Sequence, residues 1–196
     1  LADLAMRDEL TGQPNRRAIM AYARAQFEQG RQLDVPMTLA LIDLDHFKRV
    51  NDSLGHQAGD MLLQTVADRI TAALRWTPPG VDSARGADIV ARFGGDEFVL
   101  LLSGNPTPAA VASVAEKLLA AVGLPLQAEG ASISVTPSIG VAMFPEHGRT
   151  PAQLIKHADT AMYHAKAHGR AHWRVFEPAM AETAYAELEL ESALAL

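Results

Sequence analysis

The chain has 196 residues, 48% of them hydrophobic, which is enough apolar material for one domain with a buried core. The 17 Lys and Arg residues are outnumbered by 23 Asp and Glu, and the formal net charge of -6 argues against binding to polymeric DNA or RNA. The absence of cysteine excludes a disulfide framework, a thiolate zinc site and a cysteine nucleophile. No apolar run approaches the roughly 20 residues that span a bilayer, and Leu1 to Asp8 does not have the order of a signal peptide. We therefore expect a soluble, cytoplasmic fragment, whose parent protein could still be anchored in a membrane.

The first half of the chain predicts helices around one buried strand. Asn15 to Gln29 has apolar residues at helical spacing, and Met37 to Leu44 is a short apolar run without a polar face, as in a central strand. Phe47 to Leu54 and Asp60 to Leu74 are expected to be helical, separated by a break at Gly55 to Gly59.

The second half predicts a hairpin followed by alternating elements. Trp76 to Gly86 has the prolines and glycines of a loop, and Asp88 to Phe93 and Phe98 to Leu102 are two strands of a hairpin. The remaining expected elements are a helix at Thr107 to Val122, strands at Ile133 to Thr136 and Ile139 to Phe144, a helix at Pro151 to His168 and a strand at Trp173 to Phe176. This order predicts an α+β fold, an α/β sandwich with one sheet and flanking helices.

The end of the predicted central strand carries two acids, Asp43 and Asp45. Carboxylates beyond the carboxyl end of a buried strand lie where α/β folds usually bind ligands, and their oxygens suit Mg²⁺. The alternative from the residues alone is that these acids cap the following helix.

The predicted hairpin has Gly94, Gly95, Asp96 and Glu97 at its tip. Two glycines permit positive φ in a tight turn and leave room for a substrate, while the two acids project from the turn. An ordinary hairpin with a solvated acidic turn would have the same pattern.

Near the end of the predicted helix at Pro151 to His168, Lys166 and Arg170 are four residues apart. Two cations at this spacing project to roughly one side and are suited to a polyphosphate. The alternative is a favourable interaction of both cations with the carboxyl end of the helix.

Taken together, these segments resemble the GGDEF domains, the diguanylate cyclases. The matching segments, in the order of the family, are DELTGQPNRR (Asp8 to Arg17), DLDHFKRVND (Asp43 to Asp52), GHQAGD (Gly55 to Asp60), GGDEF (Gly94 to Phe98), SIG (Ser138 to Gly140) and YHAKAHGR (Tyr163 to Arg170). The resemblance implies a central, mainly antiparallel sheet flanked by helices, similar to the nucleotidyl cyclase and polymerase palm. Gln13 and Ala171 stand where the family commonly has leucine and asparagine, which puts stability rather than chemistry in doubt.

The resemblance also implies an activity: the metal-dependent condensation of two GTP into cyclic di-GMP and two pyrophosphates. It implies Mg²⁺ or Mn²⁺ held by Asp43, the carbonyl of Leu44, Asp96 and Glu97, with Asp96 and Glu97 as the catalytic pair. Because one domain binds one GTP, a transient homodimer is implied.

The resemblance further implies the substrate contacts. Asn51 and Asp60 match the guanine readers, because a carboxylate accepts from the N1 and 2-amino donors that adenine lacks. Phe47, Lys48, Lys166 and Arg170 match the triphosphate cradle.

Two alternatives to the cyclase activity stay open. One is a regulatory module that binds GTP or cyclic di-GMP with weak or no catalysis, although such domains usually have an altered signature. The other is an adenylyl or guanylyl cyclase that makes a monomeric cyclic nucleotide, which the GGDEF hairpin and the guanine pair disfavour.

Two further features suggest a larger context. Arg85 and Asp88 form an RxxD pair with five residues between Asp88 and Gly94. This is the spacing at which many members of the family carry an inhibitory site for their product, and the alternative is a loop salt bridge. We assign residues 1–177 to the domain and 178–196 to an amphipathic helical tail that resembles the connection to an EAL domain. A terminal helix packed on its own domain or on a partner is the alternative.

Overall fold

The computed structural model describes residues 4–33, 36–75, 88–103, 107–128 and 130–183. Its helices are a 3₁₀ turn η1 (Leu4–Met6), α1 (Arg16–Leu33), α2 (Phe47–Leu54), α3 (His56–Arg75), α4 (Pro108–Val122) and α5 (Pro151–Ala167). Its strands are β1 (Met37–Leu44), β2 (Ile89–Gly94), β3 (Glu97–Leu102), β4 (Leu126–Ala128), β5 (Ala131–Ile133), β6 (Pro137–Phe144) and β7 (Trp173–Val175).

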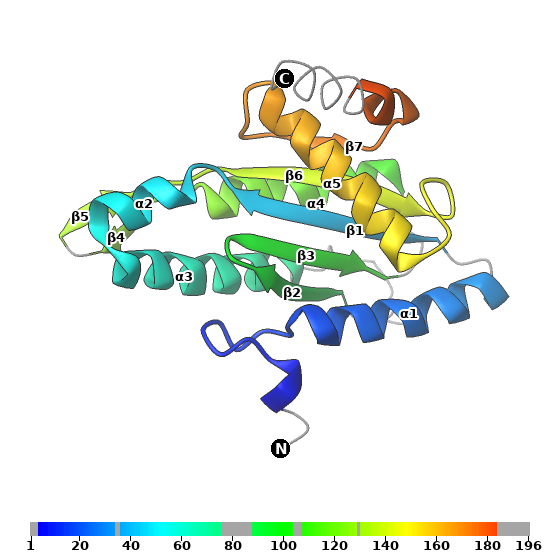
Figure 1. Cartoon of the computed structure of the whole chain (residues 1–196), viewed down its shortest axis with the longest axis horizontal. Coiled ribbons are helices and arrows are strands. Elements are labelled where there is room, and N and C mark those ends of the chain that lie inside the picture. Colours follow the sequence, from blue (N-terminus) through cyan, green and yellow to red (C-terminus); the bar gives the residue numbers. More distant parts are fainter. Residues whose placement is uncertain (1–3, 34–35, 76–87, 104–106, 129, 184–196) are drawn as a thin grey trace, which may run out of the picture.

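A five-stranded sheet with the order β2-β3-β1-β6-β7 forms the centre of the described chain (Figure 1). All neighbours in it are antiparallel except β6 and β7, which run parallel. Strands β4 and β5 form a separate two-stranded sheet. The prediction of an α+β fold with a mainly antiparallel sheet is confirmed.

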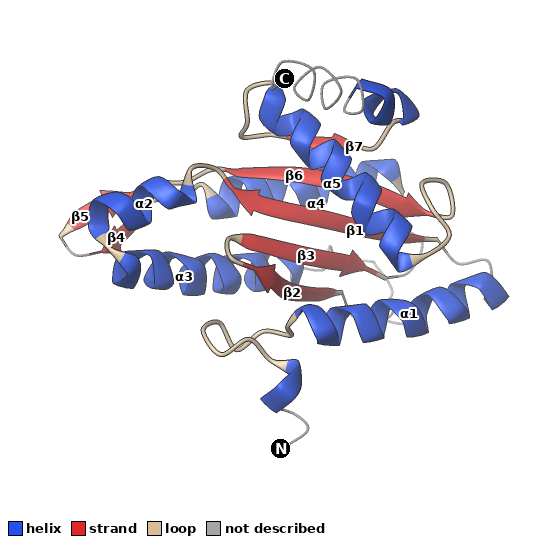
Figure 2. Cartoon of the chain, in the orientation of Figure 1, coloured by secondary structure: helices blue, strands red, loops and turns tan. Residues whose placement is uncertain are grey.

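The two faces of the sheet bury two separate apolar clusters. Ala40, Ile42 and Leu44 of β1 pack in the cluster that α3 and α4 complete, whereas Leu39 and Leu41 pack in the cluster with α1 and α5. Figure 2 shows the sheet in red with helices on both sides. Since side chains alternate along a strand, a strand covered on both faces has no polar face, which explains the apolar run in the sequence.

Helix α5 lies directly against β6, as Figure 1 shows. A Cβ atom on Gly140 would collide with the carbonyl oxygen of Ala158 and the backbone nitrogen of Met162. The glycine of the SIG segment therefore permits this close approach. The hydroxyl of Thr150 caps the helix by accepting from the backbone N–H of Gln153 at 3.2 Å.

Three predicted boundaries were wrong. Helix α1 continues beyond the predicted end at Gln29 to Leu33. Helix α3 begins at His56 rather than at Asp60. Gly59 does not break this helix but lies inside it, where its missing Cβ leaves room for the side chain of Asn51. The predicted strand at Ile133 to Thr136 is replaced by the short β5, which ends at Ile133 and pairs with β4. Neither of these three-residue strands is long enough to show a period.

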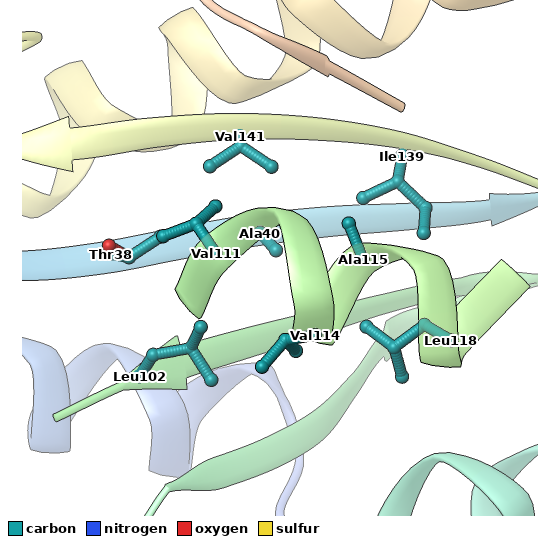
Figure 3. Close-up of a pocket in the computed structure, with 9 residues that line it drawn as sticks. All are labelled: Thr38, Ala40, Leu102, Val111, Val114, Ala115, Leu118, Ile139 and Val141. Carbon is teal, nitrogen blue, oxygen red and sulfur yellow. The ribbon is translucent and has the colours of Figure 1, made fainter. Parts of the chain in front are cut away.

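A small pocket lies between α4 and the sheet (Figure 3). Its lining is apolar except for Thr38, so it does not offer the polar groups that a nucleotide needs. Among the described residues, no helix combines the length and the hydrophobicity required to cross a membrane.

Candidate functional site

The turn between β2 and β3 is held in one shape by glycine and arginine. Gly94 pairs with Glu97, so Gly95 and Asp96 form a two-residue turn, and Gly95 adopts a φ of 51° that a larger residue rarely takes. Arg92 donates from Nε and a guanidinium nitrogen to the carbonyl oxygen of Gly95, at 3.0 and 2.8 Å. The acidic turn is therefore a fixed structure.

Arg92 also connects this turn to the amino-terminal segment. Its guanidinium lies 3.1 Å from a carboxylate oxygen of Asp8. Although partial burial opposes the shift, hydrogen bonds from Thr11 and from Arg92 lower the pKa of Asp8. The charged carboxylate of Asp8 thus positions Arg92, and Arg92 in turn fixes the turn at Gly95.

The register of the sheet brings the acids of two motifs together. Asp43 on β1 lies opposite Glu97 on β3. Since side chains alternate along a strand, Asp43 lies on the same face of the sheet as Leu41, and Glu97 on the same face as Val99. Leu41 and Val99 pack in the cluster with α1 and α5. Asp43 forms an ion pair with Lys166 of α5, with 3.0 Å between Nζ and Oδ2. Asp43, Glu97 and Lys166 thus converge on the face of the sheet that α5 covers.

The carboxylates raise one another's proton affinity. Burial and the charges of Asp96 and Glu97 raise the pKa of Asp43 to about 6, against the lowering effect of Lys166. Burial and the charges of Asp159 and Asp96 raise the pKa of Glu97. Negative charge is therefore concentrated here beyond what Lys166 neutralises.

Sequence reasoning missed Asp159, which acts on this charge balance from α5. It lies seven residues before Lys166, which places both on one face of the helix after two turns. That spacing was a signal in the sequence.

The residues present fit a divalent cation by their chemistry, although they are not closed around one. Among the described residues, no group of three or more His, Cys, Asp or Glu side chains is placed to hold a metal ion as it stands. The mutually repelling carboxylates of the buried Asp43 and of the half-buried Asp96 and Glu97 are nevertheless the oxygen donors that Mg²⁺ prefers, and a cation would relieve the repulsion that contributes to the raised pKa of Asp43. Next to them, the N–H of Leu44 donates to the carbonyl of Asp96 at 3.3 Å, which fixes the backbone of one expected ligand against another.

Asp45 is bound quite differently. Its carboxylate accepts from the hydroxyls of Thr136 and Ser138, both at 2.7 Å, and from the backbone N–H of Ala171 at 3.1 Å. The residue before helix α2 is His46, which makes no side-chain capping bond. The helix-capping alternative therefore does not hold for Asp45, which instead joins β1 to β6 and to the segment after α5.

The predicted guanine readers lie together on α2 and α3. Asn51 packs over Gly59, directly before Asp60, and its Oδ1 is buried without a hydrogen-bond partner in the described part of the chain. Asp60 is exposed. Phe47, whose ring tip also contacts the position of Gly59, and the exposed Lys48 occupy the first turn of α2.

Arg170 is not on the helix that carries Lys166. Helix α5 ends at Ala167, and Arg170 follows with a φ of 61° and an exposed side chain. The four-residue helical spacing predicted for this pair was therefore wrong, because the chain turns after Gly169 and reverses into β7.

The expected inhibitory pair is only half described. Arg85 lies outside the described residues, as does the tail beyond residue 183. Asp88 accepts from the backbone N–H of Ser103 at 3.1 Å, and burial raises its pKa. Residues 178–183 are helical.

Residues 5–172 match the family model described as "Diguanylate cyclase, GGDEF domain". The chain is 40% identical over 190 residues to the bifunctional diguanylate cyclase/cyclic di-GMP phosphodiesterase MucR of Pseudomonas aeruginosa, a match covering 97% of this chain and 26% of MucR. It is 36% identical to the diguanylate cyclase TpbB of the same species over 98% of this chain and 42% of TpbB. The chain thus spans less than half the length of these curated relatives.

Solved structures agree with this match. The GGDEF domain of TpbB superposes with a TM-score of 0.82 at 34% identity, covering 91% of this chain and 99% of that one. The coiled coil and GGDEF domain of DgcB from Caulobacter crescentus, solved in complex with c-di-GMP, has a TM-score of 0.76 at 27% identity, covering 89% of this chain and 87% of that one.

Proposed function

The chain belongs to the GGDEF domain family of diguanylate cyclases, and from this premise we propose that it condenses two GTP into cyclic di-GMP and two pyrophosphates. The observation that carries the proposal is the convergence of Asp43, Glu97 and Lys166 on one face of the sheet, beside an unaltered GGDEF turn. Each group has a function in nucleotidyl transfer. The carboxylates can hold a cation and accept a proton, and the lysine ammonium can bind phosphate oxygens.

The proposed metal ligands are Asp43, the carbonyl of Leu44, Asp96 and Glu97. Bound Mg²⁺ or Mn²⁺ supplies charge neutralisation at the α-phosphate and a lower pKa for the attacking hydroxyl. Lys166, which pairs with Asp43 at 3.0 Å, would bind phosphate oxygens once a cation took over that carboxylate.

We propose that Glu97 accepts the proton of the attacking 3′-hydroxyl. Its carboxylate accepts this proton as the hydroxyl oxygen attacks the α-phosphate of the other GTP, and pyrophosphate leaves. Burial and the charges of Asp159 and Asp96 raise the pKa of Glu97 above that of an ordinary glutamate.

Guanine recognition is assigned to Asn51 and Asp60. The buried Oδ1 of Asn51 has no partner in the described part of the chain, which is costly unless a ligand donates to it. The guanine N1 and 2-amino groups are such donors, and the exposed carboxylate of Asp60 accepts from the same edge. Lys48, Arg170 and the backbone at Phe47 complete the proposed phosphate contacts.

The reaction requires two copies of the chain. One site holds one GTP, so each 3′-hydroxyl meets the other α-phosphate only when two sites face each other. We therefore assign the activity to a transient homodimer.

The test is incubation of the chain with GTP and Mg²⁺, followed by chromatographic separation of the nucleotides. We expect cyclic di-GMP with wild type and none with Glu97→Gln, a variant of similar shape that cannot take the proton. ATP in place of GTP is the control for base recognition. Folded wild-type protein that makes no cyclic di-GMP under conditions of demonstrated dimerisation would contradict the proposal.

A regulatory GTP-binding module is the second candidate. It is favoured by relatives whose names state only phosphodiesterase activity, such as PdeR of Escherichia coli, at 36% identity over 97% of this chain. Binding of GTP by calorimetry without turnover in the same assay would establish this role.

We also propose feedback by the product at Arg85 and Asp88. Arginine binds phosphate or stacks on guanine, and a carboxylate accepts from the guanine edge. Arg85→Ala should raise the cyclic di-GMP concentration needed for inhibition and leave the initial velocity nearly unchanged. Equal inhibition of wild type and variant would contradict this site.

The tail at residues 178–196 is proposed to lead into an EAL domain. Its support is the amphipathic pattern of the sequence and the match to a bifunctional relative. A parent reading frame that stops at Leu196 would contradict the proposal.

A further inference from the structure

The turn between β6 and α5 is closed by a histidine ring. The backbone N–H of His147 donates to the carbonyl oxygen of Met143 at 2.7 Å, and the backbone N–H of Met143 donates to Nδ1 of the His147 ring at 3.0 Å. A backbone N–H only donates, so Nδ1 offers a lone pair, and Nε2 carries the proton of the neutral ring. Because the side chain is only 10% exposed, the neutral imidazole is part of the structure of the turn.

The same turn is bound to α5. The carbonyl oxygen of His147 forms a hydrogen bond with Nδ1 of His157, which lies on α5. A carbonyl oxygen only accepts, so Nδ1 of His157 donates. A movement of the His147 backbone would therefore also disturb a contact of α5.

Phe176, the first residue after β7, lies between the two imidazoles. The His157 ring stacks on it with centroids 4.1 Å apart at 11°, and the His147 ring meets it edge to face at 5.7 Å and 75°. The N–H of Phe176 donates to the carbonyl oxygen of Val141 on β6 at 2.8 Å. Phe176 and Met180 are both buried in the cluster with α1 and α5. Residues 176–183, the exit segment, follow β7 at the red end of the colours in Figure 1 and are thus fixed to the domain beside two histidines.

We propose that His147 is a pH-sensitive switch for the exit segment: the neutral ring closes the turn and supports Phe176, and protonation of Nδ1 releases both. In the imidazolium both ring nitrogens donate, so Nδ1–H would face the N–H of Met143, a donor against a donor. The ring must then leave its place in the turn, and Phe176 loses one of its two ring contacts. The switch needs no nucleotide, so it does not rest on the proposed cyclase activity.

The surroundings of His147 set the direction of its titration. Burial lowers the pKa of His147 below the ordinary 6.5, while the charge of Glu146 raises it and that of His157 lowers it. In the described part of the chain these are the two titratable groups that act on the ring. Glu146 lies in the turn, with 4.0 Å between its carboxylate and Nε2, and His157 lies on α5. The stability that the neutral ring contributes is therefore complete above pH 6.5 and is lost as the pH falls through the lowered pKa.

The test is amide hydrogen exchange of the wild-type chain without nucleotide, at pH 7.5 and at pH 5, expressed as protection factors. We expect the protection of the Met143 and Phe176 amides to fall about tenfold or more at pH 5, since the first loses its acceptor and the second its packing. The Gly123 amide, which donates to the carbonyl oxygen of Leu119 at the end of α4, is the internal reference and should keep its protection. Imidazole ¹H–¹⁵N spectra of the same samples should show His147 protonated on Nε2 alone at pH 7.5 and charged at pH 5.

Three variants separate His147 from the other histidines. In His147→Asn, an amide oxygen can accept from the N–H of Met143 but does not titrate, so the protection of both amides should be equal at the two pH values. His157→Gln removes the other ring against Phe176 and should keep the fall at pH 5. His56→Asn changes an exposed histidine on α3 and should behave as wild type.

Several results would overturn the switch. Equal protection of the Met143 and Phe176 amides at both pH values would do so, as would an Nδ1 of His147 that is already protonated at pH 7.5. A fall that persists in His147→Asn and disappears in His157→Gln would assign the titration to His157 instead. An equal fall at Gly123 would show a general loosening of the domain. The wild-type measurements decide the question even if a variant does not fold.

Discussion

Asp43 and Asp45 are two residues apart in the sequence but lie in opposite environments. Asp45 accepts from two hydroxyls and one backbone N–H, at 2.7, 2.7 and 3.1 Å. Asp43 has one ion pair with Lys166 and faces the charges of Asp96 and Glu97, and burial with these charges raises its pKa to about 6. One carboxylate is fully paired by its own fold, and the other is surrounded by charge that the fold does not neutralise.

The difference shows how to separate structural from chemical acids in one motif. A buried carboxylate whose oxygens are all used by backbone and hydroxyl donors stabilises the fold and has no capacity left for a ligand. A buried carboxylate that repels its neighbours is retained at a cost in stability, which is typical of functional sites. Substitutions at the two positions should therefore have opposite effects.

The largest expected effect is on activity at Asp43. Asp43→Asn keeps the shape of the side chain and removes the charge, so we expect cyclic di-GMP synthesis to fall by about 1,000-fold, of the order of 4 kcal/mol in transition-state stabilisation. The rate is measured from GTP and Mg²⁺ by chromatography. Activity within about tenfold of wild type would show that Asp43 is not a metal ligand.

The next effect is on stability at Asp45. Asp45→Asn removes the charge and leaves one acceptor oxygen where two oxygens accept from three donors, of which the backbone N–H of Ala171 cannot reverse its role. We expect a loss of about 3 kcal/mol in the free energy of unfolding, measured by urea denaturation. Asp43→Asn is the matched control and should lose none. If both variants were equally stable, the contrast between the two acids would be wrong.

The third effect is on the pH dependence of stability. The pKa of Asp43 is about 6 in the folded chain against 3.8 for the ordinary group, so its favourable contribution is complete below 3.8 and is lost as pH rises through about 6. The amide that Asp43→Asn introduces does not titrate. This variant should therefore gain stability relative to wild type between pH 4 and pH 7, by no more than about 3 kcal/mol. Urea denaturation at both pH values measures this, and a difference that stays constant or shrinks would contradict it.

Several parts of the fold and the site were predictable from local sequence. The strand at Met37 to Leu44 was predicted with the bounds of β1, because its apolar run is covered on both faces. The turn was predicted because glycine and acidic residues fix a hairpin locally. The convergence of Asp43, Glu97 and Lys166 was not derivable from pattern alone, since it depends on the register of β1 with β3 and on α5 crossing that face.

Other features depended on tertiary contacts that have no local signal. The break predicted at Gly55 to Gly59 is only a break at Gly55, because Gly59 serves as a contact for Asn51 inside a helix. Gln13 stands where the family commonly has leucine, yet it is buried and donates to the carbonyl of Ala67 and the hydroxyl of Thr71, both at 2.9 Å. A polar residue at a core position thus found partners on α3.

Thr38, at the other end of β1, adds a third kind of polar residue to the comparison. Its side chain is fully buried, and its hydroxyl has no hydrogen-bond partner in the described part of the chain. Figure 3 shows it at the edge of the apolar pocket under α4, with Val111 and Leu102 nearby. It has neither the partners of Asp45 nor the charged neighbours of Asp43.

Thr38→Val should therefore be the smallest effect and the one with the opposite sign. Valine has nearly the same shape, and it replaces a buried hydroxyl without a partner by a methyl group that the apolar lining accepts. We expect the free energy of unfolding to rise by about 1 kcal/mol with no change in the rate of cyclic di-GMP synthesis, because the residue lies five positions before Asp43 and on the other face of the sheet. Thr38→Ser, which keeps the hydroxyl and loses the methyl group, is the matched control and should be less stable than wild type. A loss of stability in Thr38→Val would mean that the hydroxyl is satisfied in solution, by a water in the pocket, and that this polar residue belongs with Asp45 among the paired ones.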